Sequence, residues 1–427
     1  ILYKSFFSFK THNFSRGIKS ELETEVLNSL PFYTFDMELR MYKFRIYPNS
    51  KQKIRLINQF KICREIYNTL LDLNKKLMTA RKFDMNSLVK DIKTTCPEYY
   101  TQAYSQVLQN VSDRLSKAFD NFFNRVKLRK KGTKIKAGYP RFKSRIQSIT
   151  YPQDNGSAFK FVSNTRLQVS KVGSVPIVLH RVPKGKIKTM TIKYNRARQW
   201  FAVFSCEMPD SSAVHSSKEA IGIDVGIENF LTDNKGKPIA NPRFYVNAEK
   251  KLARLQRIHS KRIKGSSNRE KARIKVARQH LKVFNQRTNF LHKLSRSLTL
   301  RYGIISGEEL NIKNMVKNHW FAKSISDAGW GTFYNMLSYK AVTCGGQLLK
   351  NPRTKGSSQR CSNCGTEVDM PLSKRTFSCP ECLNVLHRDH NSAVNHLNDT
   401  VGLTGIYTPV EIPPLHHRSD GASGIIE

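Results

Sequence analysis

The chain has 427 residues, of which 39% are hydrophobic, a content that supports real cores and excludes a disordered basic tail. Its 73 Lys and Arg residues against 32 Asp and Glu residues give a formal net charge of +41, spread along the chain. A charge this large needs a polyanion, so nucleic acid is the predicted partner; a ribosome-associated or merely supercharged protein is the alternative.

The start of the chain lacks the secondary-structure pattern of the rest. The chain begins with Ile1, and a structured pattern starts only near Met37 and Met41, either of which we expect to be the true start. Residues 1–36 are therefore predicted to be an extension outside the working fold. A targeting peptide is the alternative, although the acidic residues of this stretch argue against it.

Residues 37–208 are predicted to form a β-rich domain with a helical insertion. Residues 42–47 alternate and end at Pro48, as a strand does. Helical spacing of apolar residues then predicts an insertion over about 49–127. Short alternating segments between turn residues over 150–207 predict a small barrel or sheet.

A polar, Ser-rich stretch at 209–220 is the predicted linker to a second domain. Residues 221–227 read as a buried strand around Asp224, and residues 304–310 as a second apolar strand that ends in carboxylates. The other predicted elements are a hairpin over 230–239, a helix over 324–339 and a strand over 347–350.

Residues 249–301 are predicted to be a pair of helices broken at 265–267. They hold 17 Lys and Arg residues but only 2 Glu residues, and each helix has an apolar stripe. A charge run is usually a solvated face, but such one-sidedness favours a surface that follows phosphates.

Two Cys-x2-Cys pairs, Cys361 with Cys364 and Cys379 with Cys382, are separated by fourteen residues. This is the ligand pattern of a tetrahedral zinc ribbon, predicted over 357–386. A redox-active or accidental cysteine set is the alternative. The last elements are a segment over 387–401, with a short helix at 391–397, and an irregular tail at 402–427.

Three carboxylates stand in otherwise apolar surroundings: Asp224 in a strand, Glu308 at a strand end and Asp389 at a helix start. A buried charge without a partner is costly, and a divalent cation is the simplest partner. Oxygen ligands suit Mg²⁺ or Mn²⁺, and two such ions can promote phosphodiester hydrolysis. A turn or cap role for Asp224, and Glu309 in place of Glu308, are the alternatives.

These motifs carry a resemblance to a known family. Gly-Ile-Asp-Val-Gly around Asp224, Gly-Glu-Glu-Leu-Asn-Ile-Lys around Glu308, the four-cysteine ribbon and Arg-Asp-His-Asn around Asp389 resemble the TnpB family. These are OrfB-type transposases of insertion sequences, similar to Fanzor and to miniature type V CRISPR effectors. Segments at 42–48, 140–143 and 324–330 add to the resemblance, which covers the chain from about Met37 to the tail.

The resemblance implies an RNA-guided DNA endonuclease of mixed α/β and α+β multidomain fold. Residues 37–208 would be a wedge-like β-barrel with a helical recognition insertion. Residues 221–356 and 387–401 would form a RuvC-like nuclease of RNase H fold, with the zinc ribbon inserted between them. The family's catalytic, metal-binding acids fall on Asp224, Glu308 and Asp389.

The implied cofactors are Mg²⁺ (or Mn²⁺) and Zn²⁺. The implied partners are a guide RNA from the end of the element and a double-stranded DNA target, cut beside a short adjacent motif. No apolar run approaches the ~20 residues of a membrane helix, so no membrane partner is expected. A prokaryotic cytoplasmic monomer, nucleoid-associated when bound to DNA, is the favoured picture.

The sequence departs from the family pattern at three positions. His387 stands where an acidic residue is usual, Leu383 stands where Gly usually follows the second cysteine pair, and Asn289 replaces the Asp of an Arg-x-Asp motif. None of these changes removes a catalytic acid.

The candidate nucleic-acid contacts are basic, aromatic and amide side chains of the predicted first domain, the basic helix pair and the segment around Asp389. The two amides lie on the polar side of a helix, where they could read base edges or simply be solvated. The candidates are Lys43, Arg45, Tyr47, Gln106, Asn110, Arg141, Lys143, Arg254, Arg257, Lys261, Arg278 and Arg388.

Three other functions compete with RNA-guided cleavage. A conventional DNA transposase would use the same acids, but no dedicated sequence-reading module is visible. A nuclease-inactive, RNA-guided repressor would be expected to lose one of the acids. A basic zinc-ribbon protein that only binds RNA would leave Asp224 and Glu308 unexplained.

Overall fold

The computed structural model describes residues 39–77, 82–152, 156–208, 217, 219–351, 356–371 and 374–401. The predicted extension at 1–36, the start at Met37, most of the linker and the tail at 402–427 lie outside these ranges. We call residues 39–208 the first lobe and residues 219–401 the second lobe. None of the described helices is both long and apolar enough to cross a membrane.

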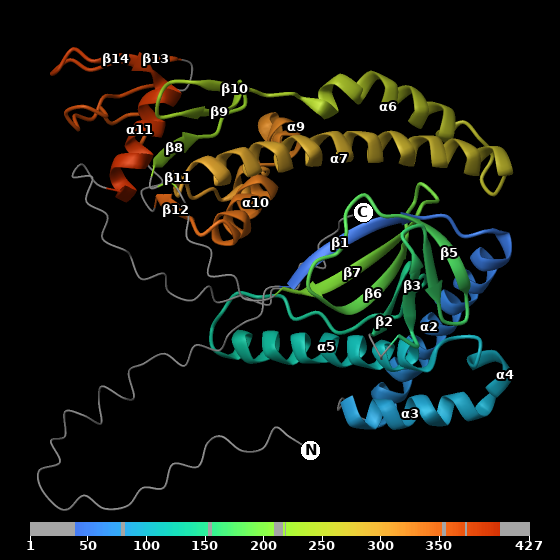
Figure 1. Cartoon of the computed structure of the whole chain (residues 1–427). Helices are drawn as coiled ribbons and strands as arrows, with labels where there is room; N and C mark the ends of the chain where they lie inside the picture. The colour runs from blue at the N-terminus through green and yellow to red at the C-terminus, as the bar shows by residue number, and fades with distance from the viewer. Residues whose placement is uncertain are drawn as a thin grey trace, which may run out of the picture.

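The first lobe contains one antiparallel sheet with the order β2-β6-β7-β1-β5-β4-β3. Because β2 and β3 are the two ends of this order, the described strands form a curved open sheet (Figure 1). The strand pattern is compatible with either a barrel or a sheet, and the family resemblance implies a barrel. The strands are β1 (Leu39–Ile46), β2 (Ser148–Pro152), β3 (Phe159–Ser163), β4 (Arg166–Val169), β5 (Gly173–Val178), β6 (Lys186–Tyr194) and β7 (Trp200–Glu207).

Four helices are inserted between β1 and β2, and the first and last of them pack against β2. They are α2 (Ser50–Leu77), α3 (Lys82–Thr95), α4 (Pro97–Tyr100) and α5 (Ser105–Lys130). Helix α2 begins with a capping box, since the side chains of Asn49 and Gln52 each accept a hydrogen bond from the backbone N–H of the other, at 2.9 and 3.0 Å. Helix α5 continues to Lys130, slightly beyond residue 127 where the insertion was predicted to end.

The second lobe contains a five-stranded sheet with the order β10-β9-β8-β11-β12. Strands β8, β11 and β12 are parallel, whereas β9 and β10 are antiparallel to their neighbours. The strands are β8 (Ala220–Asp224), β9 (Asn229–Asp233), β10 (Pro238–Ala240), β11 (Ile304–Glu308) and β12 (Gln347–Asn351).

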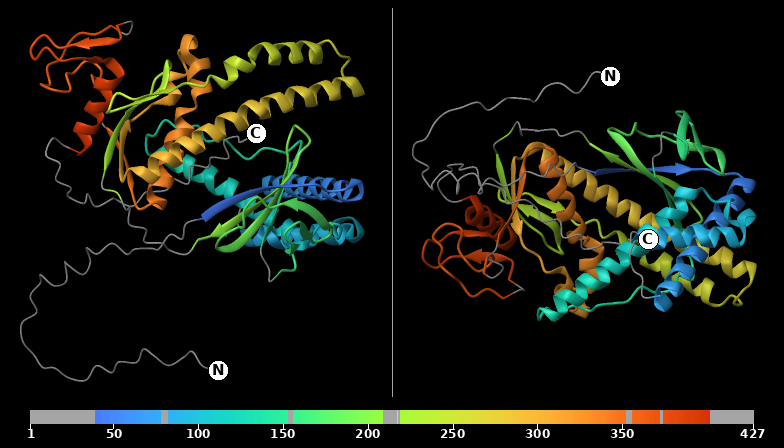
Figure 2. Two further views of the ribbon diagram at one scale, coloured as in Figure 1. Left: turned by 45° about the horizontal axis from the view of Figure 1, so that its top comes forward. Right: turned by 90° about the horizontal axis from the view of Figure 1, so that it is seen from below.

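Helices cover both faces of this sheet, with α7 and α10 on one face and α11 on the other (Figures 1 and 2). The predicted single helix over 324–339 is two helices that meet at Gly329, whose φ of 73° stops the first. The helices are α6 (Phe244–Ser260), α7 (Ser267–Arg301), α8 (Ile312–Met315), α9 (His319–Ala328), α10 (Trp330–Thr343) and α11 (Arg388–Val401).

Helix α11 lies unusually close to β8. A Cβ atom on Gly222 would be 2.1 Å from the carbonyl oxygen of Ala393, so only glycine permits this contact. The helix begins at Arg388 and not at Asn391 as the sequence predicted. Asp389 therefore lies in its first turn, on an element that is packed directly against β8.

The cysteine-rich module stands between β12 and α11 in the chain. It contains a two-stranded sheet of β13 (Thr376–Ser378) and β14 (Val385–His387), with its own small core around Phe377. The second lobe also contacts the first, where the α6–α7 hairpin reaches over the curved sheet (Figure 1). At this contact Glu270 of α7 lies 3.0 Å from Arg198 in the β6–β7 turn.

Candidate functional site

Two of the predicted carboxylates meet at one edge of the second sheet. Asp224 ends β8 and Glu308 ends the neighbouring parallel strand β11, so both side chains emerge at the carboxyl ends of the strands. Their oxygen atoms and Nε2 or Nδ1 of His396 lie within 4.8 Å of one another. The adjacent Glu309 is exposed and pairs with Lys350 at 3.8 Å, so Glu308 is the acid that faces Asp224.

This pair is largely withdrawn from solvent. Burial, and then the nearby charge of Asp224, raise the pKa of Glu308 above its usual range. The fully buried hydroxyl of Tyr334 lies over Gly307, where a Cβ atom would be only 2.6 Å away. Burial raises the pKa of Tyr334 as well, with further contributions from Asp224 and Glu308. A cation bound between the two carboxylates would offset their repulsion and the cost of burying them.

Asp389 lies close to this edge but outside the 4.8 Å group. It is buried, and its Oδ2 atom is the side-chain atom nearest to Gly226, two residues beyond Asp224. The backbone N–H of Asp389 donates to Nδ1 of His387 at 3.3 Å. His387 thus accepts a hydrogen bond at the start of α11, as the usual acidic residue at this position also could.

Sequence reasoning missed three polar residues around Asp224. Ser392 donates from Oγ to Oδ1 of Asp224 at 3.1 Å, and Nε2 of His396 lies 3.4 Å from the same oxygen. Asn351, at the end of β12, contacts His396 in turn. His396 stands seven residues after Asp389, a spacing that places both on one face of a helix. This spacing was the feature of the sequence from which a role for His396 could have been predicted.

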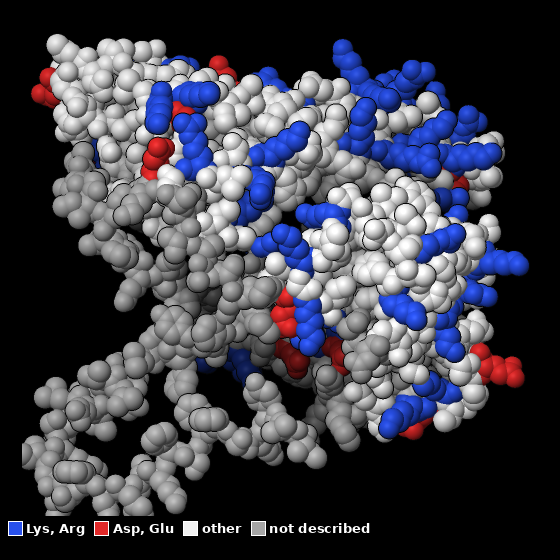
Figure 3. Space-filling view, viewed as in Figure 1, with Lys and Arg blue, Asp and Glu red and all other residues white. Residues whose placement is uncertain are grey.

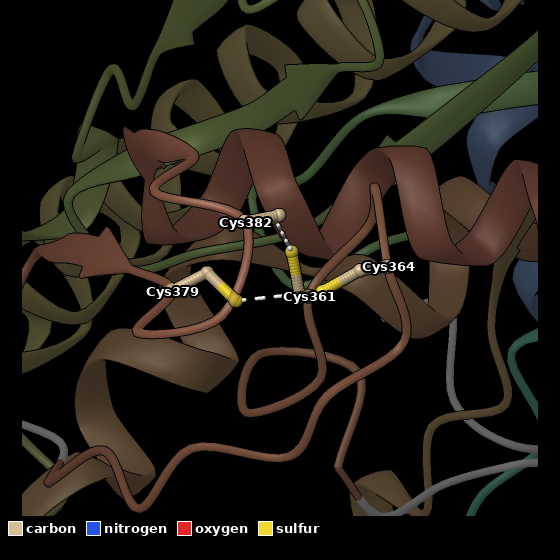
Figure 4. A group of neighbouring side chains, drawn as sticks. All are labelled: Cys361, Cys364, Cys379 and Cys382. Atoms are coloured by element: carbon tan, nitrogen blue, oxygen red, sulfur yellow. Dashed lines mark hydrogen bonds between the residues drawn. The ribbon is translucent and has the colours of Figure 1, made fainter.

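The four cysteines of the two Cys-x2-Cys pairs form a compact cluster whose sulfur atoms lie within 4.8 Å of one another (Figure 4). Cys361 and Cys382 are 3.5 Å apart at Sγ, and Cys364 and Cys379 are 3.4 Å apart. Hydrogen bonding with the side chain and backbone of Thr366 lowers the pKa of Cys364 to about 6. Four converging thiols, one of them readily ionised, fit a structural zinc ion with no open position.

Amide side chains of α11 fasten the cysteine module to this helix, which packs on the sheet of the second lobe. Nδ2 of Asn391 and Nδ2 of Asn395 both donate to the carbonyl oxygen of Arg360 at 2.7 Å. Oδ1 of Asn391 accepts from the backbone N–H of Ser362 at 2.9 Å. The backbone around Cys361 is therefore tied to the same helix that carries Asp389.

The donor set at the sheet edge fits a divalent cation. Asp224 and Glu308 offer oxygen atoms from two strand ends. Burial first, and then the charge of Asp224, raise the pKa of Glu308, and a bound cation would offset both effects. Oxygen donors of this kind suit Mg²⁺ or Mn²⁺ rather than zinc. The described residues thus include two chemically distinct groups that fit metal ions, one with carboxylates and one of thiols.

Four of the predicted nucleic-acid contacts belong to the zone between the two lobes. The Nζ atom of Lys43 lies 4.4 Å from the ring centre of Phe201. The Arg45 guanidinium lies 5.0 Å from the same ring centre and 5.4 Å from that of Tyr47. Burial lowers the pKa of Arg45, and the charge of Arg278 on α7 contributes to this shift. These side chains form a cationic, aromatic surface facing α7.

The other predicted contacts are spread over several elements. Gln106 and Asn110 are half-buried on α5, and Lys143 is exposed, with its backbone fixed by Asn68. Arg388 is largely buried, with Nε 3.6 Å from Asp389. The remaining contacts, Arg141, Arg254, Arg257 and Lys261, are exposed. The structure does not bring all twelve residues onto one surface.

The charge of the molecule is one-sided where α6 and α7 lie. In the space-filling view, Lys and Arg side chains gather at the end of this hairpin and along the adjoining side of the molecule, with few Asp or Glu side chains between them (Figure 3). Such a distribution suits a partner with regularly spaced negative charges.

Comparison with known proteins places these features in a family. The family model OrfB_IS605, described as a probable transposase, matches residues 203–319. A model of the Cas12f1-like TNB domain matches residues 330–396, and a helix-turn-helix model matches residues 37–82. A solved Cas12f1–sgRNA–target DNA complex has a TM-score of 0.50 and 14% identity, covering 84% of this chain and 98% of that chain, which shows a shared fold.

Curated relatives extend over most of the chain. A protein of Streptomyces pristinaespiralis, provisionally named RNA-guided DNA endonuclease, is 33% identical over 84% of this chain and 88% of its own length. InsQ of Escherichia coli, with the same provisional name, is 29% identical over 84% and 92% of the two chains. TnpB-like protein L770 of Acanthamoeba polyphaga mimivirus is 24% identical over 86% and 74%. The chain therefore belongs to the TnpB family of OrfB-type insertion-sequence transposases.

Proposed function

We propose that this protein is an RNA-guided endonuclease that cleaves double-stranded DNA beside a short adjacent motif. The observation that carries the proposal is the convergence of Asp224 and Glu308 at the ends of two parallel strands, with Asp389 on the helix packed against them. Relatives named as RNA-guided DNA endonucleases, over most of the chain, support the same conclusion.

The strand order β10-β9-β8-β11-β12, with β8, β11 and β12 parallel, supports a RuvC-like RNase H fold for residues 221–356 and 387–401. The cysteine module at 357–386 would be an inserted zinc ribbon. The curved sheet and inserted helices of residues 37–208 would be the wedge and recognition lobe, and 209–220 the linker.

Mg²⁺ or Mn²⁺, when bound, would supply an activated water and stabilise the leaving oxygen of a phosphodiester. Asp224 and Glu308 would hold the cation from two strand ends, and Asp389 would complete the set from α11. Ser392 would keep Oδ1 of Asp224 in place through its hydrogen bond. The burial that raises the pKa of Glu308 would also strengthen the charge interactions at this edge.

The nucleic acid would be held by its backbone. The basic α6–α7 hairpin and the surface of Lys43, Arg45, Tyr47 and Arg278 face the zone between the lobes, where a guide–target duplex would be bound without reading its sequence. Pairing with the guide would supply the specificity that charge alone cannot give.

The test uses the purified full-length protein and the RNA that co-purifies with it, sequenced end to end. A plasmid carrying the sequence complementary to the guide end, beside a randomised flank, is incubated with Mg²⁺. We expect cleavage only with the RNA, and only for a subset of flanks. Equal cleavage with and without RNA would favour a plain nuclease or a transposase. Site-specific binding without cleavage would favour the repressor.

Matched variants test the assignment of the acids. Glu308→Gln is expected to abolish cleavage while RNA binding persists, because the variant keeps the size and loses the charge. Glu309→Gln, one residue further on the same strand end and exposed, is expected to cleave normally. Equal loss in both variants would show that the strand end, and not the carboxylate facing Asp224, matters.

A further inference from the structure

His396 is a fully buried imidazole that neither the sequence pattern nor the proposed chemistry uses. Its Nε2 atom lies 3.4 Å from Oδ1 of Asp224 and 3.3 Å from Oγ of Ser392. An imidazole here has two possible roles. It can bind a cation through an unprotonated Nε2, or it can donate a hydrogen bond from Nε2 to the carboxylate.

The contacts of the other ring nitrogen, Nδ1, distinguish these two roles. Nδ2 of Asn351 lies 2.8 Å from Oδ2 of Asp399 and 3.2 Å from Nδ1 of His396. The Asp399 carboxylate only accepts hydrogen bonds and is itself held by Arg360 at 2.6 Å, so the amide group facing it must be the NH₂. The second hydrogen of this NH₂ group then points at Nδ1 of His396.

A nitrogen that receives a hydrogen bond cannot carry a proton of its own. Nδ1 of His396 is therefore the acceptor, and the neutral ring carries its proton on Nε2, facing Asp224. A doubly protonated ring would set two donors, Nδ1–H and the Asn351 amide, against each other. The amide of Asn351, fixed by Asp399, thus selects the tautomer of His396.

We propose that Asn351 and His396 are positioning residues that orient the Asp224 carboxylate, and that His396 is not a metal ligand. The Nε2–H group of His396 faces Oδ1 of Asp224 at 3.4 Å and Oγ of Ser392 at 3.3 Å, and Ser392 itself donates to Oδ1. The two side chains together would fix the orientation of this carboxylate. The inference rests on the proposed function, because Asp224 serves as a metal-binding carboxylate only there.

The same contacts link the cysteine cluster to the sheet edge. Arg360 directly precedes Cys361, its guanidinium holds Asp399, and Asp399 fixes Asn351. Asn351 is also the register partner of Glu308 in the β11–β12 pair. A displacement of the first cysteine pair is therefore transmitted to Asp224 through side chains as well as through α11.

Histidine ¹⁵N spectra test the tautomer directly. The sample is the full-length protein with its co-purifying RNA and labelled histidine, and the signal of His396 is assigned by its loss in His396→Gln. We expect the proton on Nε2, both before and after Mg²⁺ is added. A proton on Nδ1, or its departure from Nε2 when Mg²⁺ is added, would overturn the proposal.

Mn²⁺ affinity, measured by electron paramagnetic resonance without DNA, tests the consequence. His396→Leu should weaken Mn²⁺ binding about tenfold, as loss of a group that orients a metal ligand does. His396→Gln, whose amide can still donate, should regain most of the affinity. His390→Gln on the same helix, where the imidazole contacts the carbonyl of Asn234, is the control and should bind normally.

Unchanged Mn²⁺ affinity in His396→Leu, or equal losses in the His396→Leu and His390→Gln variants, would contradict the proposal. Should His396→Leu fail to fold, the spectra of the unsubstituted protein still decide. Neither measurement needs cleavage. A protein that passes both but never cuts DNA would refute the nuclease, whereas cleavage with the proton on Nδ1 would refute the positioning role alone.

Discussion

Leu383, directly after the second cysteine pair, adopts a positive φ of 54°. Its side chain is 80% exposed, so replacing it removes little packing. This left-handed conformation costs an L-residue ~1–2 kcal/mol, which the greater chain entropy of glycine, ~0.5–1 kcal/mol, only partly offsets. Leu383→Gly should therefore raise the melting temperature slightly and slow zinc loss to a chelator. Gly365→Ala is the opposing variant, because Gly365 has a φ of 82° and open space around it. Stabilisation by both variants would contradict this account.

Glu308 is expected to oppose folding when no divalent ion is bound. Burial and the charge of Asp224 raise the pKa of Glu308 in the folded protein above its value in the unfolded chain. The contribution of Glu308 to stability therefore falls as pH rises from the unfolded-state pKa through the folded-state pKa. Glu308→Gln should therefore raise the melting temperature at neutral pH in a chelator and lose the stabilisation that Mg²⁺ gives the unsubstituted protein. Glu309→Gln is the control. A lower melting temperature for Glu308→Gln in chelator would contradict the prediction.

At the scale of the element, Asp327 serves as a cap that comes from a different helix. Helix α6 begins after Arg243, whose side chain makes no cap; instead the buried carboxylate of Asp327 on α9 accepts from the backbone N–H of Tyr245 at 2.9 Å. Asp327→Ala should cost ~1–3 kcal/mol of unfolding free energy and speed hydrogen exchange at the start of α6. Ser326→Ala, exposed on the same turn, should change neither.

The cysteine module is expected to act on cleavage before it acts on RNA binding. Cys361→Ser, or removal of zinc with a chelator, should free the Arg360 carbonyl from Asn391 and Asn395 and displace the first turn of α11. Cleavage should then be lost at a chelator concentration that leaves RNA affinity unchanged. Metal analysis and filter binding check both parts. Protein without zinc that cuts normally would contradict this prediction.

Much of this arrangement is readable from the sequence, for identifiable reasons. Asp224 and Glu308 stand out because a carboxylate in an apolar strand is rare, and the cysteine spacing is specific. Sequence periodicity does not show which helix lies on which strand. The cap by Asp327 and the contact of His396 with Asp224 join residues that are distant in the chain, so only the fold reveals them. The open edge of the first sheet likewise depends on which strands pair, and the alternation of residues within each strand does not show this.

At the scale of the whole molecule, one charged cluster joins the two lobes. Hydrogen bonding to Arg273, reinforced by Arg198 and opposed by burial, lowers the pKa of Glu270 to about 2. Arg273 also donates to the carbonyl oxygen of Arg196 in the β6–β7 turn, at 3.1 Å. The contact should therefore be complete above the ordinary pKa of a glutamate and be lost as pH falls toward about 2.

Glu270→Gln should accordingly loosen the two lobes at neutral pH, an effect that high salt reproduces in the unsubstituted protein. Energy transfer between dyes on the two lobes measures the separation. Glu249→Gln, which removes an ion pair with Lys323 inside the second lobe, is the matched control and should leave the separation unchanged. Equal effects of the two variants would show that net charge, and not this contact, sets the distance.

The position of the cysteine module in the chain determines the order in which the parts are made. The module precedes α11, so Asp389 and His396 leave the ribosome after every strand of both main sheets. The basic helices α6 and α7 are complete well before that, and domains generally fold as they emerge. A nascent chain of the proposed endonuclease would therefore be able to bind RNA while the space beside Gly222 still lacks its helix. The proposed enzyme would bind its guide before it acquired the means to cut.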